Sequence, residues 1–78
     1  MRVIYTYEGE RDPEFENSMT AQVGEHADVR QVKAEPTGKG YVEVTLETTL
    51  DTTDRDLVDR LRAHERIIDV TEGDKRMV

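Results

Sequence analysis

Cysteine and tryptophan are absent from this sequence, and long apolar runs are missing as well. Without cysteine there can be no disulfide, thiolate metal site, iron–sulfur cluster or thiol nucleophile. A membrane-spanning helix needs about 20 mostly apolar residues, whereas Arg2 already interrupts the apolar start of this chain. We therefore predict no direct insertion of this segment into a membrane, no secretory signal and a cytoplasmic location.

Positive charge is scarce. The chain carries 18 acidic residues against 11 basic ones, a formal net charge of −7, and only Lys33, Lys39 and Lys75 are lysines. Phosphate contacts supply most of the non-specific affinity for nucleic acids, so the lack of a basic stripe predicts no nucleic-acid partner. Scarce lysine is typical of a protein from a high-salt cytoplasm, although a high-GC genome also favours arginine.

The length of 78 residues, 35% of them hydrophobic, predicts one small domain. A chain of this size buries roughly 60% of its unfolded surface, so its core is thin. No linker, repeat or second domain is visible. We predict a single domain over residues 1–78, with residues 73–78 as a mobile polar tail.

The first half of the chain predicts a strand, a helix and a second strand. Residues 2–8 are rich in β-branched and aromatic side chains, which favour a strand. Asp12-Pro13 then supplies an N-cap and a proline for the first position of a helix that ends near Gly24. Its apolar stripe consists of Phe15, Met19 and Val23. Residues 28–35 precede a proline and predict a short edge strand.

The second half predicts a hairpin, a helix and a last strand. Residues 36–40 supply the turn, and residues 41–50 alternate between apolar and polar side chains. Thr52 and Thr53 offer N-caps for a second helix. Its apolar face contains Leu57, Val58 and Leu61, and its expected ion pairs are Arg55–Asp59 and Asp56–Arg60. Residues 67–71 form the closing strand.

This order of elements predicts the α+β, ferredoxin-like βαββαβ fold, in which two helices cover one face of a four-stranded antiparallel sheet. The face of the first strand that meets the helices stays open, and Val3, Tyr5 and Tyr7 are one candidate set. The same fold hosts RNA-recognition motifs, which stack bases on aromatic side chains of central strands. Because no basic residue supports such stacking here, we expect at least two of Tyr5, Tyr7 and Tyr41 in the core or an interface.

No complete catalytic or metal-binding motif is present. The segment Thr37-Gly38-Lys39-Gly40 lacks the Ser or Thr of a phosphate-binding loop and joins two strands, which favours a hairpin turn. His26 and His64 lack the spacing of metal ligands. The aspartates at positions 51, 54, 56 and 59 lack the calcium-loop pattern and suit a helix start instead. We predict no metal, no cofactor and no enzymatic activity.

Residues 28–72 resemble ACT and ACT-like regulatory modules through an extended D-V-R-Q-V-K-A, a hairpin into G-Y-V-E-V-T-L and a closing I-I-D-V. They are also similar to the soluble C-terminal domains of MgtC-type membrane proteins. The resemblance implies an amino-acid or other small-ligand site at the first strand-to-helix loop, at a dimer interface. ACT domains often carry D-x-P-G there. This chain has G-E-R-D-P followed by Glu14, so the implied ligand-binding residues are Gly9 and Asp12.

The expected function is that of a non-enzymatic regulatory or interaction module, which forms a homo-oligomer or is attached to a larger protein. Two alternatives stay open. One is a small-ligand sensor with its site at Gly9 and Asp12. The other is a small enzyme with carboxylate chemistry, which requires a strongly perturbed Asp or Glu in a cleft.

Overall fold

The computed structural model describes residues 2–49 and 54–72. The expectations for Leu50, for Asp51 and for the tail at 73–78 lie outside these residues. The elements are β1 (Arg2–Glu8), α1 (Pro13–Gly24), β2 (Val29–Pro36), β3 (Tyr41–Thr48), α2 (Arg55–Arg62) and β4 (Ile67–Glu72). Each predicted element is therefore present, with ends that differ from the prediction by at most a few residues.

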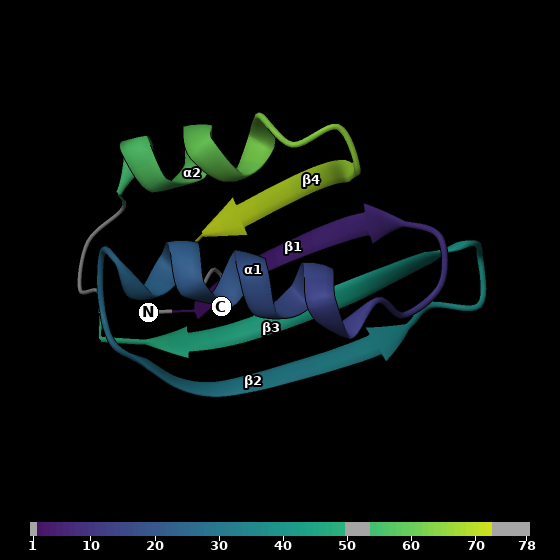
Figure 1. The fold of residues 1–78 in the computed structure, drawn as a ribbon, viewed down its shortest axis with the longest axis horizontal. Coiled ribbons are helices and arrows are strands. Elements are labelled where there is room, and N and C mark those ends of the chain that lie inside the picture. Colours follow the sequence, from purple (N-terminus) through teal and green to yellow (C-terminus); the bar gives the residue numbers. More distant parts are fainter. Residues whose placement is uncertain (1, 50–53, 73–78) are drawn as a thin grey trace, which may run out of the picture.

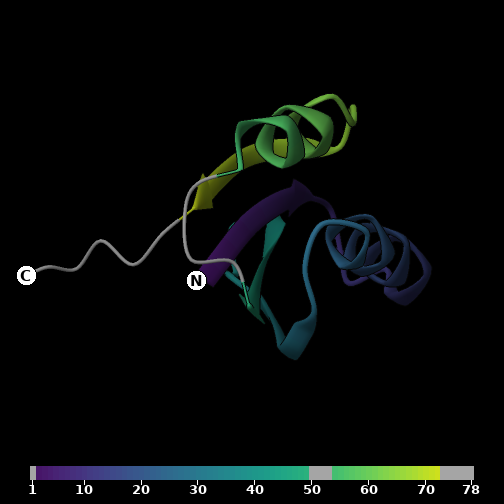
Figure 2. The same ribbon diagram turned by 90° about the vertical axis from the view of Figure 1, so that its left-hand side faces the viewer.

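The four strands form one antiparallel sheet in the order β2-β3-β1-β4 (Figure 1). Strands β1 and β3 lie in the middle, and β2 and β4 are the edges. Both helices lie on the same side of the sheet (Figure 2). This arrangement confirms the predicted ferredoxin-like fold. No helix in the described parts of the chain is long and apolar enough to cross a membrane.

The core lies between the helices and one face of the sheet. Period-two alternation buries Val3, Tyr5 and Tyr7 of β1 completely, which identifies them as the helix-facing set. Strands β3 and β4 and the two helices complete this core with Val42, Val44, Leu46, Val70, Met19, Val23, Leu57 and Leu61. Two of the three tyrosines are therefore core residues, as predicted. Burial of each large apolar side chain contributes roughly 1.5–3 kcal/mol.

The two helices begin at aspartates. The Asp12 carboxylate accepts from the Phe15 N–H at 3.2 Å, and Pro13 follows it, as predicted. Helix α2 corrects the prediction, because its N-cap is Asp54, which accepts from the Leu57 N–H at 3.0 Å. The expected caps, Thr52 and Thr53, lie outside the described residues. An aspartate directly follows these two threonines, and it is Asp54 that has the extended backbone of an N-cap.

The solvated face of α2 contains one of its two predicted ion pairs. The Arg60 Nε and Asp56 Oδ2 atoms are 3.1 Å apart, whereas no ion pair joins Arg55 to Asp59. The orientation of the residues accounts for the difference, since an acid placed four residues before a base is more favourable than the reverse. The prediction was therefore wrong for the pair at the start of the helix.

Candidate functional site

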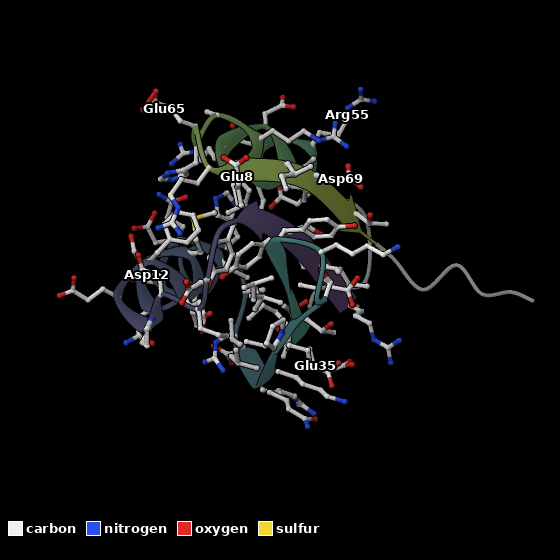
Figure 3. The ribbon with its side chains drawn as sticks, turned by 90° about the vertical axis from the view of Figure 1, so that its right-hand side faces the viewer. Glu8, Asp12, Glu35, Arg55, Glu65 and Asp69 are labelled. Atoms are coloured by element: carbon white, nitrogen blue, oxygen red, sulfur yellow. The ribbon has the colours of Figure 1, made fainter. Side chains whose placement is uncertain are left out.

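Three loops meet at one end of the molecule, the end that Figure 3 views, where Glu8, Asp12 and Glu65 are labelled. The β1–α1 loop is joined to the hairpin between β2 and β3 by a hydrogen bond from the Gly9 N–H to the Gly40 carbonyl, at 2.9 Å. The Glu8 N–H donates to the Arg66 carbonyl at 3.0 Å, which brings the start of β4 to the same place.

Glycine is required where these loops touch. Gly9 has a φ of +103°, which L side chains rarely adopt, and a Cβ there would lie 3.5 Å from Arg66 Nη2. Gly40 has a φ of +91°. The segment before Gly40 closes the hairpin with a hydrogen bond from the Thr37 N–H to the Tyr41 carbonyl. Gly38 and Gly40 thus serve a hairpin turn between two strands, as predicted.

A hollow of about 360 Å³ opens between the β1–α1 loop and the hairpin. We call it the loop hollow. The residues that line it are Gly9, Glu10, Arg11, Pro36, Gly38, Gly40 and Tyr41. Its walls combine a cation, a carboxylate, an aromatic ring and exposed glycine backbone. Such a set suits a small molecule that carries charge and an apolar part.

A buried carboxylate, that of Glu16, binds Arg11 in the wall of this hollow. The side chain of Glu16 is only 8% exposed and accepts from Arg11 Nε at 2.9 Å and Arg11 Nη2 at 3.0 Å. It also accepts from the Tyr7 hydroxyl. Burial on its own opposes ionisation, but the hydrogen bonds from Arg11 and Tyr7 outweigh it and lower the pKa of Glu16. Glu16 is therefore ionised, and Arg11 is fixed beside the hollow.

The Tyr7 hydroxyl connects this carboxylate to the loop. It accepts from the Asp12 N–H at 2.8 Å while it donates to Glu16. Burial and the bond to Glu16 raise the pKa of Tyr7, so its hydroxyl keeps its proton. Burial likewise raises the pKa of Tyr5, although the Tyr5 hydroxyl has no hydrogen-bond partner among the described residues.

Arg66 fastens the β1–α1 loop through contacts with residues at both of its ends. Arg66 Nη1 donates to Asp12 Oδ2 at 2.7 Å, and Arg66 Nη2 donates to the Glu8 carbonyl at 3.2 Å. The guanidinium also lies 5.0 Å from the ring centre of Tyr7 and 4.8 Å from that of Phe15. The bond from Arg66 and the Phe15 N–H lower the pKa of Asp12. Both oxygens of this carboxylate are therefore engaged within the fold.

The two residues that sequence reasoning assigned to a ligand are thus placed differently. Gly9 forms part of the wall of the loop hollow, whereas Asp12 lies outside its lining and caps α1. Sequence reasoning missed Glu16 and Arg66. The only local signal for Glu16 was Arg11, a loop cation five residues before it.

The histidines hold structural contacts between the two halves of the fold. His26 Nδ1 lies 2.9 Å from Asp54 Oδ2, which joins the end of α1 to the start of α2. His64 Nε2 lies 3.1 Å from the side-chain nitrogen of Gln22, and its ring meets Phe15 edge to face. Within residues 2–49 and 54–72, no group of three His, Cys, Asp or Glu side chains is arranged to hold a metal ion.

The element order, the sheet topology and the one-sided helices define a ferredoxin-like domain. Comparison with solved structures finds the same fold in an ACT domain. The chain superimposes on the ACT domain from GTP pyrophosphokinase of Chlorobium tepidum with a TM-score of 0.67 and 18% sequence identity. The match covers 90% of this chain and 91% of that domain. No protein-family model and no curated protein matches the sequence.

Proposed function

We propose that this chain is a non-enzymatic regulatory module that binds a small ligand in the loop hollow. The observation that carries the proposal is the hollow itself. It has a volume of about 360 Å³ and lies between the β1–α1 loop and the hairpin, with Gly9 in its wall. The hydrogen bonds from Arg11 and Tyr7 to Glu16 fix the side chain of Arg11 in the wall of the hollow. This side chain therefore loses little conformational freedom when a ligand binds.

The chemistry of the walls favours a ligand of the amino-acid type. Arg11 keeps donors free beyond its two bonds to Glu16, and these suit a carboxylate. Glu10 supplies a negative charge for an ammonium group. Pro36 and the half-buried Tyr41 offer apolar surface for a side chain.

Two observations support a regulatory role over carboxylate catalysis. A catalytic carboxyl acid would need a raised pKa, whereas the pKa values of Asp12, Glu16 and Asp54 are all shifted downward. The histidines of the described chain are also committed to contacts between the helices. The fold likeness to an ACT domain supports the same choice by analogy alone.

We further propose that the module works as a homodimer or as part of a larger protein. Strand β2 is a free edge with Val32 46% exposed, and pairing with a second copy would cover this side chain. The uncovered face of the sheet is polar, with a pair between Arg2 and Glu47, and suits a hydrated surface better than a dry interface. Attachment to an MgtC-type membrane protein rests on the sequence pattern and has no support from the comparisons.

Thermal unfolding against a panel of amino acids, nucleotides and divalent cations tests the ligand proposal. A ligand at 100 times its Kd adds about 2.7 kcal/mol, and each kcal/mol raises Tm by roughly 4–8 °C for a domain of this size. Glu10→Gln and Tyr41→Ser should remove the shift, whereas Glu14→Gln, on exposed α1 surface, should keep it. A panel without any shift, or a shift that survives both substitutions, would contradict a site in the loop hollow.

A further inference from the structure

The arginines in the described part of this acidic chain fall into two groups. Four of them hold a carboxylate within 3.1 Å, in the pairs Arg2–Glu47, Arg11–Glu16, Arg60–Asp56 and Arg66–Asp12. Arg55 and Arg62, both on α2, hold none among the described residues. Arg30 on β2 is also unpaired, but it stands alone on an exposed edge. Two unneutralised cations on one short helix therefore require a separate explanation.

Both arginines line the same hollow. Arg55, Val58, Asp59 and Arg62 occupy helix positions i, i+3, i+4 and i+7 and border a volume of about 460 Å³, which we call the α2 hollow. Arg62 Nη2 donates to the Val70 carbonyl at 3.0 Å, which places this flank of the helix over the edge strand β4. Arg55 points outward from the helix (Figure 3). The volume lies within the range of small-molecule sites, roughly 300–1,000 Å³.

Arg62 lies in the last turn of α2, where the helix dipole favours a cation, but Arg55 is not placed for the stability of the helix. Arg55 is the first residue of α2, where the helix dipole disfavours a cation. Asp59 lies four residues after Arg55 and three before Arg62, yet it forms an ion pair with neither. In a chain with a net charge of −7, this flank nevertheless carries a local excess of one positive charge.

We propose that the α2 hollow binds a small organic dianion whose two anionic ends contact Arg55 and Arg62. Seven residues of helix separate the two Cα atoms by about 10 Å, so the ends of the ligand must also be separated. Asp59 repels an anionic group at the centre of the hollow, and Val58 offers apolar contact there. The middle of the ligand is therefore uncharged. Carboxylate and phosphate ends both suit a guanidinium fork.

This site is separate from the loop hollow, because no residue in the described part of the chain lines both. Within residues 2–49 and 54–72, Arg62 keeps most of its donors after its one bond to Val70, and Arg55 keeps all five. The negative charge elsewhere on the chain disfavours adventitious binding of anions outside this flank.

A titration of the ¹⁵N-labelled full chain at low salt tests the proposal by NMR. The probes are succinate, adipate and suberate, which place two carboxylates at increasing separation, together with hexanoate and pyrophosphate. We expect saturable shifts in residues 55–62 and binding that tightens from succinate to suberate, with hexanoate at least about tenfold weaker. Pyrophosphate, whose charges are adjacent, should bind no better than succinate. A bisphosphate ester of a length comparable to suberate shows whether the site binds phosphate ends more tightly than carboxylate ends.

Matched variants locate the site. Arg55→Gln and Arg62→Gln should each weaken suberate binding about tenfold, while Arg60→Gln, on the same helix but paired with Asp56, should leave it unchanged. Arg55 has no partner inside the described fold, so its substitution keeps the test valid even if Arg62→Gln perturbs β4.

Three outcomes would overturn the proposal. One is a shift that grows without saturation up to about 10 mM ligand. Another is equal loss of binding in Arg60→Gln, since a diffuse ion atmosphere does not distinguish these arginines. The third is binding of a glutamate-rich peptide without any binding of the diacids, which would assign the flank to a protein partner instead.

Discussion

Arg11 and Glu16 form an ion pair whose two partners differ in solvent exposure, and this difference leads to a quantitative prediction about stability. The side chain of Arg11 is 47% exposed, whereas that of Glu16 is 8% exposed. Removal of the arginine leaves a buried anion without a cationic partner, and its remaining donors in the described structure are the Tyr7 hydroxyl and the Asp12 backbone. Removal of the anion leaves a cation that can turn into water. The more exposed partner should therefore be the more costly one to substitute.

The contacts set the magnitude. Arg11→Gln removes both charge-assisted hydrogen bonds that Arg11 donates to Glu16. The cost falls on the buried Glu16 carboxylate, which keeps its charge without its cationic partner, and we expect a loss of about 2 kcal/mol in the free energy of unfolding from this unpaired group. Glu16→Gln keeps an acceptor for Tyr7 and should cost about 1 kcal/mol. The double variant should be no less stable than Arg11→Gln alone, because the buried charge is gone.

The pH dependence has a definite sign. The folded-state pKa of Glu16 is lowered, so its contribution to stability is present above its unfolded pKa and is lost as the pH falls through the folded value. In Arg11→Gln the remaining influence of burial raises that pKa. The deficit of this variant should therefore be largest near pH 7 and shrink as the pH falls below about 4.3.

Urea unfolding, followed by circular dichroism at pH 7 and at a pH below about 4.3, measures the difference in stability between Arg11→Gln and the parent protein. With an m-value of about 1–3 kcal/mol/M, a loss of 2 kcal/mol moves the midpoint by roughly 1 M. The reasoning is refuted if Arg11→Gln stays within about 0.3 kcal/mol of the parent at pH 7. It also fails if Glu16→Gln is the more damaging of the two substitutions.

Three further predictions concern single groups. Tyr7→Phe should cost about 1–2 kcal/mol because its hydroxyl bonds to two partners, whereas Tyr5→Phe should be neutral or stabilising because the Tyr5 hydroxyl has none; chemical denaturation of both variants checks the difference. Gly9→Ala should lower stability by about 1–2 kcal/mol at its positive φ, while Gly24→Ala, with nothing near its added Cβ, should raise it slightly; opposite shifts of Tm are the signature. Asp54→Ala should destabilise the protein through loss of the α2 N-cap, and an unchanged unfolding midpoint would contradict that role.

The fold could be predicted because its signals are local. The alternation from Val42 to Thr48 and the Asp12-Pro13 start of α1 each lie within a few residues of the structure they specify. The start of α2 was misplaced because Thr52, Thr53 and Asp54 are consecutive residues that all suit an N-cap. The N-cap preferences of these side chains do not decide which of the three residues begins the helix.

The site was harder to predict because its contacts are distant in sequence. A glutamate in the first turn of a helix is explained by the helix dipole, so the sequence offered no reason to bury Glu16. Its burial follows from Tyr7 on the preceding strand, which places a hydroxyl at that spot. Arg66 reaches Asp12 across 54 positions, and no pattern in the sequence links them.

That last distance has a consequence for how the protein is made. The β1–α1 loop is synthesised before the arginine that fastens it, which follows Asp12 by 54 residues. Strand β1 also needs β4 at its side to complete the sheet. We therefore expect a nascent chain that ends before β4 to lack a formed loop, and the loop hollow to appear only once the whole domain has folded. The proposed ligand binding would then require synthesis through β4, because a product truncated before β4 has the residues of the loop hollow without its shape.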